Sequence, residues 1–349
     1  MVQVGNLTER FSTLALVLAA VAIAVTGCSG EGSSNSSRSN NAGKNTSTQH
    51  SESWVNKAPA FSGDSAYSNV AAQVDFGTRV PNSPGHKACG DWLIEELEKA
   101  GAQLHVQEAS VTAFDGTELA IRNIIGSFNP EDPRRILLYA HWDTRPWADN
   151  DTVRIHDPID GANDGASGVG VLLEIARLIQ LKNPQTGVDI AFFDAEDYGS
   201  PSWVPADQKE YTDWCLGSQY WARKPHVPGY RARMGILLDM VGAGDAVFNK
   251  EGTSNEMAPG LVDRVWTMAH KLGHGDRFRT AVTPFTVDDN LFVTQLAHIP
   301  SVNIVHYHIA RVPMGYFKYH HTHGDNMSVI DPAVLQEVGE VVAAMVWNK

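Results

Sequence analysis

Apolar residues in this chain form either short continuous runs or longer segments in which they recur every three or four positions. These short runs, which are nearly all apolar, lie at residues 135–140, 188–193 and 234–238. The helical repeats lie at residues 84–101, 164–181, 261–272 and 332–347. Short apolar runs are typical of strands buried on both faces, and two further strands are expected at 104–108 and 119–128. Because strands and helices alternate, the pattern predicts an α/β fold with a mostly parallel central sheet and helices on both faces.

The N-terminus has a different pattern, a single apolar run from Phe11 to Val25. Its length is that of a signal-peptide core and is short for a membrane span. The run ends in Val25-Thr26-Gly27-Cys28, which resembles the lipobox of bacterial lipoproteins. We therefore expect residues 1–28 to be a lipoprotein signal peptide with Cys28 as the lipid anchor. The alternative is an ordinary secretory signal with an incidental cysteine.

The segment that follows has the composition of a linker. Residues 29–53 are mostly Ser, Asn, Gly and Thr, so they cannot bury a core and are expected to form a flexible tether. No similar break divides residues 54–349, which we interpret as one catalytic domain. The expected location is a bacterial cell envelope, with the exported protein facing the periplasm or the surface. An Asp directly after the lipidated cysteine would indicate that the lipoprotein is retained in the inner membrane, but this chain has Ser29 there. We therefore expect the lipoprotein to lie in the outer membrane where the cell has two membranes.

Charge and cysteine content narrow the class of protein. The chain has 27 Lys+Arg against 40 Asp+Glu, and the net charge of −13 argues against nucleic acid as a partner. Hydrophobic residues make up 43%, which is ordinary for a globular protein. Three cysteines are too few for a disulfide-rich scaffold, and we expect Cys89 and Cys215 to be free thiols.

Acidic residues and a histidine follow the three apolar runs directly. They are His141, Asp143, Glu196, Asp197 and Asp239. In open α/β sheets the ligand site lies beyond the carboxyl ends of the strands, so these side chains are expected to meet. Adjacent carboxylates repel each other, and a cation would relieve that repulsion. Carboxylate and imidazole ligands together favour zinc in a catalytic site.

Other candidates lie outside the strands, and each has an ordinary structural explanation. Asp164 alone could be a helix N-cap, and the histidines near the C-terminus could be a surface tract. These histidines are His320, His321 and His323. A serine hydrolase is disfavoured because the segment around Ser167 lacks the closing glycine of a nucleophile elbow. No glycine-rich phosphate loop followed by Lys is present.

The order of these motifs resembles the zinc aminopeptidase superfamily. The resemblance rests on segments 76–81, 141–143, 161–168, 193–197, 238–239 and 321–322. Within that superfamily, several stretches look like bacterial glutaminyl cyclases, which convert an N-terminal glutamine of peptides or proteins to pyroglutamate and release ammonia. These stretches are 140–149, 214–218, 238–243, 287–290 and 321–326. The resemblance implies a three-layer αβα sandwich with a mixed, mostly parallel sheet. The alternative is a two-metal aminopeptidase of the same fold, and a non-catalytic binding domain is disfavoured because every ligand position is retained.

The resemblance also implies roles for individual residues. The zinc ligands would be Asp164, Asp197 and His321. In two-metal relatives, His141 and Asp239 would hold a second ion, so one zinc is expected for a cyclase and two for an aminopeptidase. Glu196 would be the general acid/base. Asp239 and Asp289 would form a hydrogen-bond network beside the substrate, with Asp288 replacing Asp289 if the alignment slips by one.

The pocket walls are expected to be aromatic. We expect Trp203, Trp214 and His320 to contact the substrate, and Trp203 is chosen because it closely follows the Glu196-Asp197 turn. Animal glutaminyl cyclases carry a Trp immediately before the zinc histidine, where this chain has His320.

Overall fold

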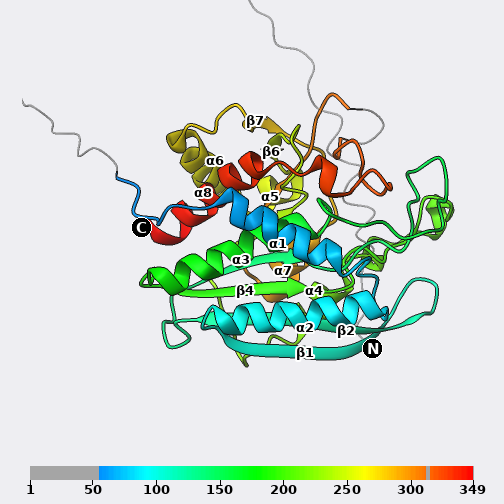
Figure 1. The fold of residues 1–349 in the computed structure, drawn as a ribbon, viewed down its shortest axis with the longest axis horizontal. Helices are drawn as coiled ribbons and strands as arrows, with labels where there is room; N and C mark the ends of the chain where they lie inside the picture. Colours follow the sequence, from blue (N-terminus) through cyan, green and yellow to red (C-terminus); the bar gives the residue numbers. More distant parts are fainter. Residues whose placement is uncertain (1–54, 312–314, 349) are drawn as a thin grey trace, which may run out of the picture. The chain divides into compact units, whose positions relative to one another are not determined.

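A computed structural model describes residues 55–311 and 315–348 (Figure 1). The predicted signal peptide, lipid anchor and tether, at residues 1–53, lie outside the described residues. No helix within the described residues is long and apolar enough to cross a membrane.

Six strands of the described chain form the central sheet in the order β1-β2-β4-β3-β5-β8. Their bounds are β1 Gln103–Thr112, β2 Glu118–Phe128, β3 Arg135–His141, β4 Gly187–Phe193, β5 Gly235–Asp239 and β8 Ser301–Val305. The four strands from β4 to β8 are parallel, and β1 and β2 are joined antiparallel at one edge. The predicted mixed, mostly parallel sheet is confirmed.

Helices cover both faces of this sheet, as Figure 1 shows. Along β3, Ile136 and Leu138 belong to one hydrophobic core, whereas Leu137 and Tyr139 belong to another. The first core includes residues of α1 Gly63–Asp75, α2 Pro84–Lys99, α3 Ala166–Leu181, α6 Pro259–Leu272 and α8 Pro332–Trp347. The second includes residues of α4 Leu216–Arg223 and α7 Asp289–Ala297. Every strand of the parallel part is therefore buried on both sides, which explains the continuous apolar runs.

Smaller elements complete the described structure. Their bounds are β6 Phe248–Lys250, α5 Gly252–Met257, β7 Phe278–Val282, η2 Ala206–Gln208, η3 Tyr211–Asp213 and η4 Met327–Val329. Cys89 and Cys215 are both buried and unpaired, which confirms the expectation of free thiols.

The register of the sheet brings the strand ends together. His141 pairs with Phe193 across β3 and β4, and Asp239 pairs with Val305 across β5 and β8. The residues that follow these strands therefore emerge side by side at one edge.

The close approach of α3 to the sheet depends on a glycine. A Cβ at Gly168 would lie 2.2 Å from the carbonyl oxygen of Leu238 and 2.9 Å from the Cβ of Ala140. We expect Gly168→Ala to lower the free energy of unfolding by about 1–3 kcal/mol, because the helix must move away from the sheet. Urea denaturation measures this change.

Gly260→Ala in α6 is the matched control, since a Cβ there meets nothing within 4 Å. A Gly168→Ala variant as stable as this control would contradict the close packing of α3.

Candidate active site

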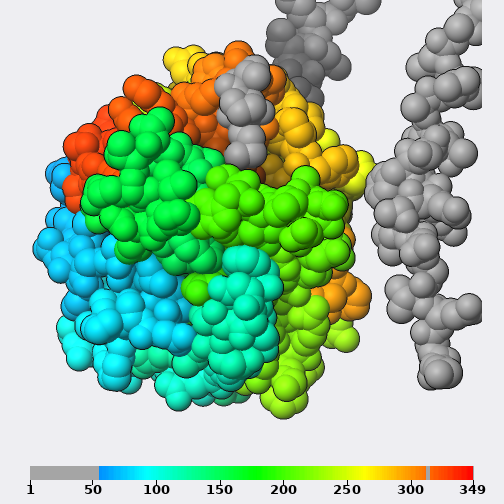
Figure 2. Space-filling view, turned by 90° about the vertical axis from the view of Figure 1, so that its right-hand side faces the viewer, coloured from blue at the N-terminus to red at the C-terminus, as the bar shows by residue number. Residues whose placement is uncertain are grey.

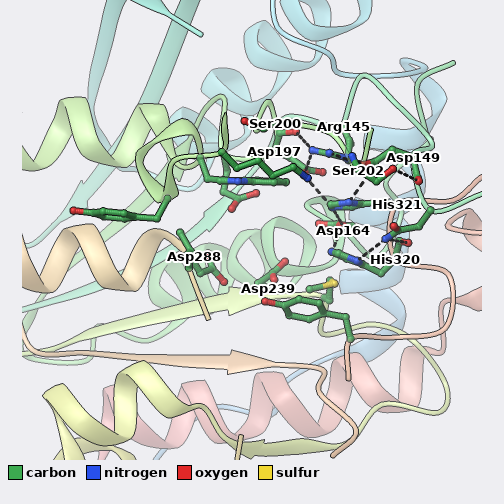
Figure 3. Close-up of a pocket in the computed structure, with 18 of the residues that line it drawn as sticks. Arg145, Asp149, Asp164, Asp197, Ser200, Ser202, Asp239, Asp288, His320 and His321 are labelled. Carbon is green, nitrogen blue, oxygen red and sulfur yellow. Dashed lines mark hydrogen bonds and ion pairs between the residues drawn. The ribbon is translucent and has the colours of Figure 1, made fainter. Parts of the chain in front are cut away.

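A cavity of about 380 Å³ opens at the edge where β3, β4 and β5 end. Figure 2 views this edge, where the green segments that follow β3 and β4 occupy the middle of the face. Figure 3 shows the acidic and histidine side chains that line the cavity. The acidic and histidine residues that line the cavity are Asp149, Asp164, Glu196, Asp197, Glu210, Asp239, Asp288, His320 and His321.

Asp164, Asp197 and His321 come from three separate segments, and both carboxylates lie close to the His321 ring. His321 Nε2 lies 3.1 Å from Asp197 Oδ1 and 3.8 Å from Asp164 Oδ2. Asp164 Oδ2 and Asp197 Oδ2 are buried and have no hydrogen-bond partner among the described residues. Buried carboxylate oxygens without partners are unfavourable unless a cation binds them. Two carboxylates and one imidazole fit a catalytic zinc site, which typically has three protein ligands and an open position.

His141 and Asp239 form a second group that shares Asp164. His141 Nε2 lies 3.2 Å from Asp164 Oδ1 and 3.4 Å from Asp239 Oδ1, and its Nδ1 lies 3.4 Å from Asp143 Oδ1. Burial lowers the pKa of His141, but the three carboxylates outweigh it and raise this pKa well above its ordinary value. Burial raises the pKa of Asp239 to about 6. This group has the donor types for a second ion, as the resemblance implied.

Backbone N–H groups hold the two ligand-bearing turns in place through buried carboxylates. Asp143 accepts the N–H groups of Glu196 and Asp197, each at 3.1 Å. Asp325 accepts the N–H group of Asp164 at 3.0 Å. Asp164 is not the helix N-cap that it could have been, because Gly165 occupies that position in α3. The Asp164 carboxylate is therefore free to face the cavity.

Arg145 and Asp149 support the histidine side of the site. Asp149 Oδ1 lies 3.4 Å from His321 Nδ1, and Asp149 accepts two hydrogen bonds from Arg145 at 2.6 and 2.8 Å. Arg145 also donates to the carbonyl oxygen of Asp197 at 2.9 Å and lies over the ring of Trp214. No role was predicted for Arg145, Asp149 or Asp325, although each lies in a segment that carries the resemblance. The burial of these charged side chains in the structure indicates that they support the site, and the sequence pattern does not show that they are buried.

We expect Asp149→Asn to weaken zinc binding about 10- to 100-fold, because a carboxylate beside the non-ligating nitrogen orients a histidine ligand and makes it more basic. Competition with a chromophoric chelator measures this affinity. Asp157→Asn, at an exposed carboxylate that faces Arg154, is the control and should bind zinc as the parent does. Unchanged affinity in a folded Asp149→Asn variant would contradict the supporting role.

Glu196 lines the cavity next to the three candidate ligands. Its Oε1 accepts from the thiol of Cys215 at 3.3 Å. Burial raises the pKa of Glu196 well above its ordinary value. A raised pKa suits a carboxyl group to general acid–base catalysis better than the ordinary value of an exposed glutamate does.

The two aspartates at the start of α7 have different positions. Asp288 lines the cavity, caps α7 and accepts from Asn303 Nδ2 at 2.6 Å. Asp289 is fully buried and is not among the residues that line the cavity, and burial raises its pKa to about 7. The structure thus places Asp288 at the cavity wall, where the sequence interpretation favoured Asp289.

The predicted aromatic walls are present in part. Trp214 and His320 line the cavity, and Trp214 stacks on His321 with ring centroids 6.0 Å apart. Trp203 is not among the lining residues. Its side chain is 41% exposed and packs edge-on against Trp147 and His156. Trp203 therefore lies outside the pocket, because its loop turns the indole toward these neighbours.

Comparison with known proteins agrees with this geometry. Bacteroides thetaiotaomicron glutaminyl cyclase, solved with N-acetylhistamine, is 50% identical with a TM-score of 0.81, covering 84% of this chain and 99% of that one. Tannerella forsythia glutaminyl cyclase is 49% identical with a TM-score of 0.81, covering 83% of this chain and 100% of that one. A leucine aminopeptidase precursor from Bacteroides thetaiotaomicron is 50% identical with a TM-score of 0.81, covering 84% and 100%.

These likenesses confirm the predicted fold class and the predicted class of enzyme. The model of Peptidase family M28 matches residues 123–346, a range that includes β3, β4, β5 and all the candidate ligands. The chain belongs to Peptidase family M28.

Proposed function

We propose that this protein is a zinc-dependent glutaminyl cyclase that converts an N-terminal glutamine of peptides or proteins to pyroglutamate and releases ammonia. The observation that carries the proposal is the likeness, at about half identity, to two glutaminyl cyclases over nearly their whole lengths. The cavity chemistry supports it, because one carboxyl group suited to proton transfer lies beside a candidate zinc site.

Asp164, Asp197 and His321 would hold the zinc ion, which supplies a Lewis acid that polarises the γ-carbonyl of the substrate. The α-amino nitrogen of the glutamine forms a bond to Cδ, and the bond from Cδ to the amide nitrogen breaks. Glu196 takes the proton from the attacking amine and passes it to the departing nitrogen, which leaves as ammonia. No water enters the products, so the cavity must favour ring closure over hydrolysis.

The remaining residues orient the substrate for this intramolecular attack. Asp239 and Asp288 lie on the cavity wall and would bind the α-amino group. Trp214 supplies an apolar surface for the side chain of the glutamine. Holding the amine and the γ-carbonyl in contact replaces an unfavourable chain closure with a preorganised geometry.

The second candidate function is a two-metal aminopeptidase. The group formed by His141, Asp164 and Asp239 favours it, since the donor atoms of these residues could hold a further ion. We propose one zinc per chain for the cyclase, whereas an aminopeptidase of this family type would need two.

Mass spectrometry of two peptides tests the proposal, one beginning with Gln and the other with Leu. The expected result is loss of one ammonia from the Gln peptide and no change in the Leu peptide. Release of free Leu, with addition of one water, would instead establish the aminopeptidase.

We further propose that the chain is anchored to a bacterial cell envelope through Cys28 and acts on exported peptides. The support is the sequence pattern of residues 1–53 alone. Cys28→Ala should move the protein from the membrane fraction to the soluble fraction of its host. Membrane association that survives this change would contradict the anchor.

A further inference from the structure

His320 lies in the wall of the cavity, directly beside the candidate zinc ligand His321. Its ring stacks on Tyr316 with centroids 4.6 Å apart and on His321 with centroids 3.6 Å apart. The side chain is only 12% exposed. Figure 3 shows His320 and His321 together beside Asp164. The imidazole is thus held in one orientation next to the reacting groups.

The donor atoms of Asp164, His320 and His321 are close enough together to hold one ion, but the stacking of the two rings disfavours His320 as a further ligand of the ion that His321 would bind. The two rings are inclined by only 25°, and their Nε2 atoms lie at similar distances from Asp164 Oδ2, 3.9 and 3.8 Å. A ligating lone pair lies in the plane of its ring, and zinc binds histidine nitrogen at about 2.1 Å. An ion in the plane of His321 would be displaced from the plane of His320 by most of the separation between the rings. His320 Nε2 is therefore available for another purpose.

The position of Asn150 favours one tautomer of His320. Its Nδ2 lies 3.2 Å from the carbonyl oxygen of His320 and 3.4 Å from Nδ1 of the same residue. The amide must present nitrogen here, because its oxygen would face the carbonyl oxygen. His320 Nδ1 then accepts a hydrogen bond, and a neutral ring carries its hydrogen on Nε2. His320 and Asp164 both line the cavity, and His320 Nε2 lies 3.9 Å from Asp164 Oδ2.

We propose that His320 donates a hydrogen bond from Nε2 to the γ-carbonyl oxygen of the bound glutamine. The inference rests on the proposed cyclase function and adds a catalytic residue to it. The ring keeps its proton throughout, so the bonds made and broken are those of cyclisation alone. The hydrogen bond strengthens as negative charge develops on the oxygen, and a preorganised donor of this kind accelerates the reaction. Animal glutaminyl cyclases carry Trp at this place, so an imidazole donor distinguishes this chain from them.

His320→Phe in the full-length protein tests the proposal, because it keeps an aromatic ring in the stack and removes the donor. We expect kcat for a Gln peptide to fall about 100-fold, while KM changes little and the zinc content is unchanged. His320→Gln restores an N–H donor and should recover a large part of the loss. His323→Phe, at a histidine whose ring faces the Arg154 carbonyl at the surface, should match the parent.

A second readout does not depend on turnover. Nitrogen-15 spectra of the histidine rings, with His320→Phe identifying the signal, should show a neutral ring protonated on Nε2. An Nδ1–H ring would overturn the proposal. So would an unchanged kcat, a rise in KM alone, loss of zinc, or equal losses in the Phe and Gln variants.

The activity of the parent enzyme distinguishes failure of the proposed function from failure of the inference on His320. A parent that releases no ammonia from Gln peptides overturns the proposed function and this inference with it. A parent that does so, with His320→Phe equally fast, overturns the inference alone.

Discussion

Glu196→Gln is expected to retain its zinc and to lose about 10²- to 10⁴-fold in kcat, the range typical of a general acid–base group. Glutamine has nearly the same shape and can still accept from the Cys215 thiol, but it cannot carry the proton from the attacking amine to the leaving nitrogen. Steady-state ammonia release measures kcat, and elemental analysis measures the metal content.

The control for this variant is Glu256→Gln, at an exposed position, which should behave as the parent. Full activity in Glu196→Gln would show that another group moves the proton. Loss of zinc from the variant would instead place Glu196 among the ligands.

Removal of zinc by a chelator is expected to abolish turnover, and one equivalent of zinc per chain should restore it. The physical reason is the polarisation of the γ-carbonyl, which the zinc ion would supply as a Lewis acid. The chelated protein should also unfold at a lower temperature, since an ion that binds only the native state stabilises it. Titration of zinc into the chelated enzyme, followed by activity, measures the stoichiometry.

The same titration with His141→Ala tests whether a second zinc ion is bound. If a single ion suffices, this variant should still bind one zinc per chain through Asp164, Asp197 and His321. A requirement for two equivalents in the parent would contradict the single-ion proposal and favour the aminopeptidase.

The parallel core of the fold could be predicted because burial on both faces leaves a plain pattern in the chain. β3, β4 and β5 were expected within a residue or two of their observed bounds, and α8 at the observed bounds. β8 was missed because Asn303 interrupts its short apolar run. Asn303 Nδ2 donates to Asp288, a contact that only the tertiary structure shows. The helix α7 was missed as well because its apolar stretch is short, although Asp288 and Asp289 are residues typical of a helix start.

The candidate ligands could be predicted for a related reason. Residues that directly follow parallel strands share one edge of the sheet, so their convergence follows from the strand pattern alone. The positions of the tryptophan side chains do not follow from the strand pattern. Trp203 and Trp214 both lie in the long segment after β4, yet only Trp214 lines the cavity, because loop geometry decides where each ring points.

The order of apolar runs and polar strand ends was thus enough to establish an α/β enzyme, the edge that carries its chemistry and the residue types that could bind zinc. Folding decided the finer features: the Asp143 and Asp325 carboxylates that hold the ligand turns, the choice of Asp288 over Asp289 at the cavity wall, and the stacked rings that aim His320 at the cavity. These features depend on contacts between residues far apart in the chain. Local hydrophobic pattern reports which residues are buried, but not which buried groups meet.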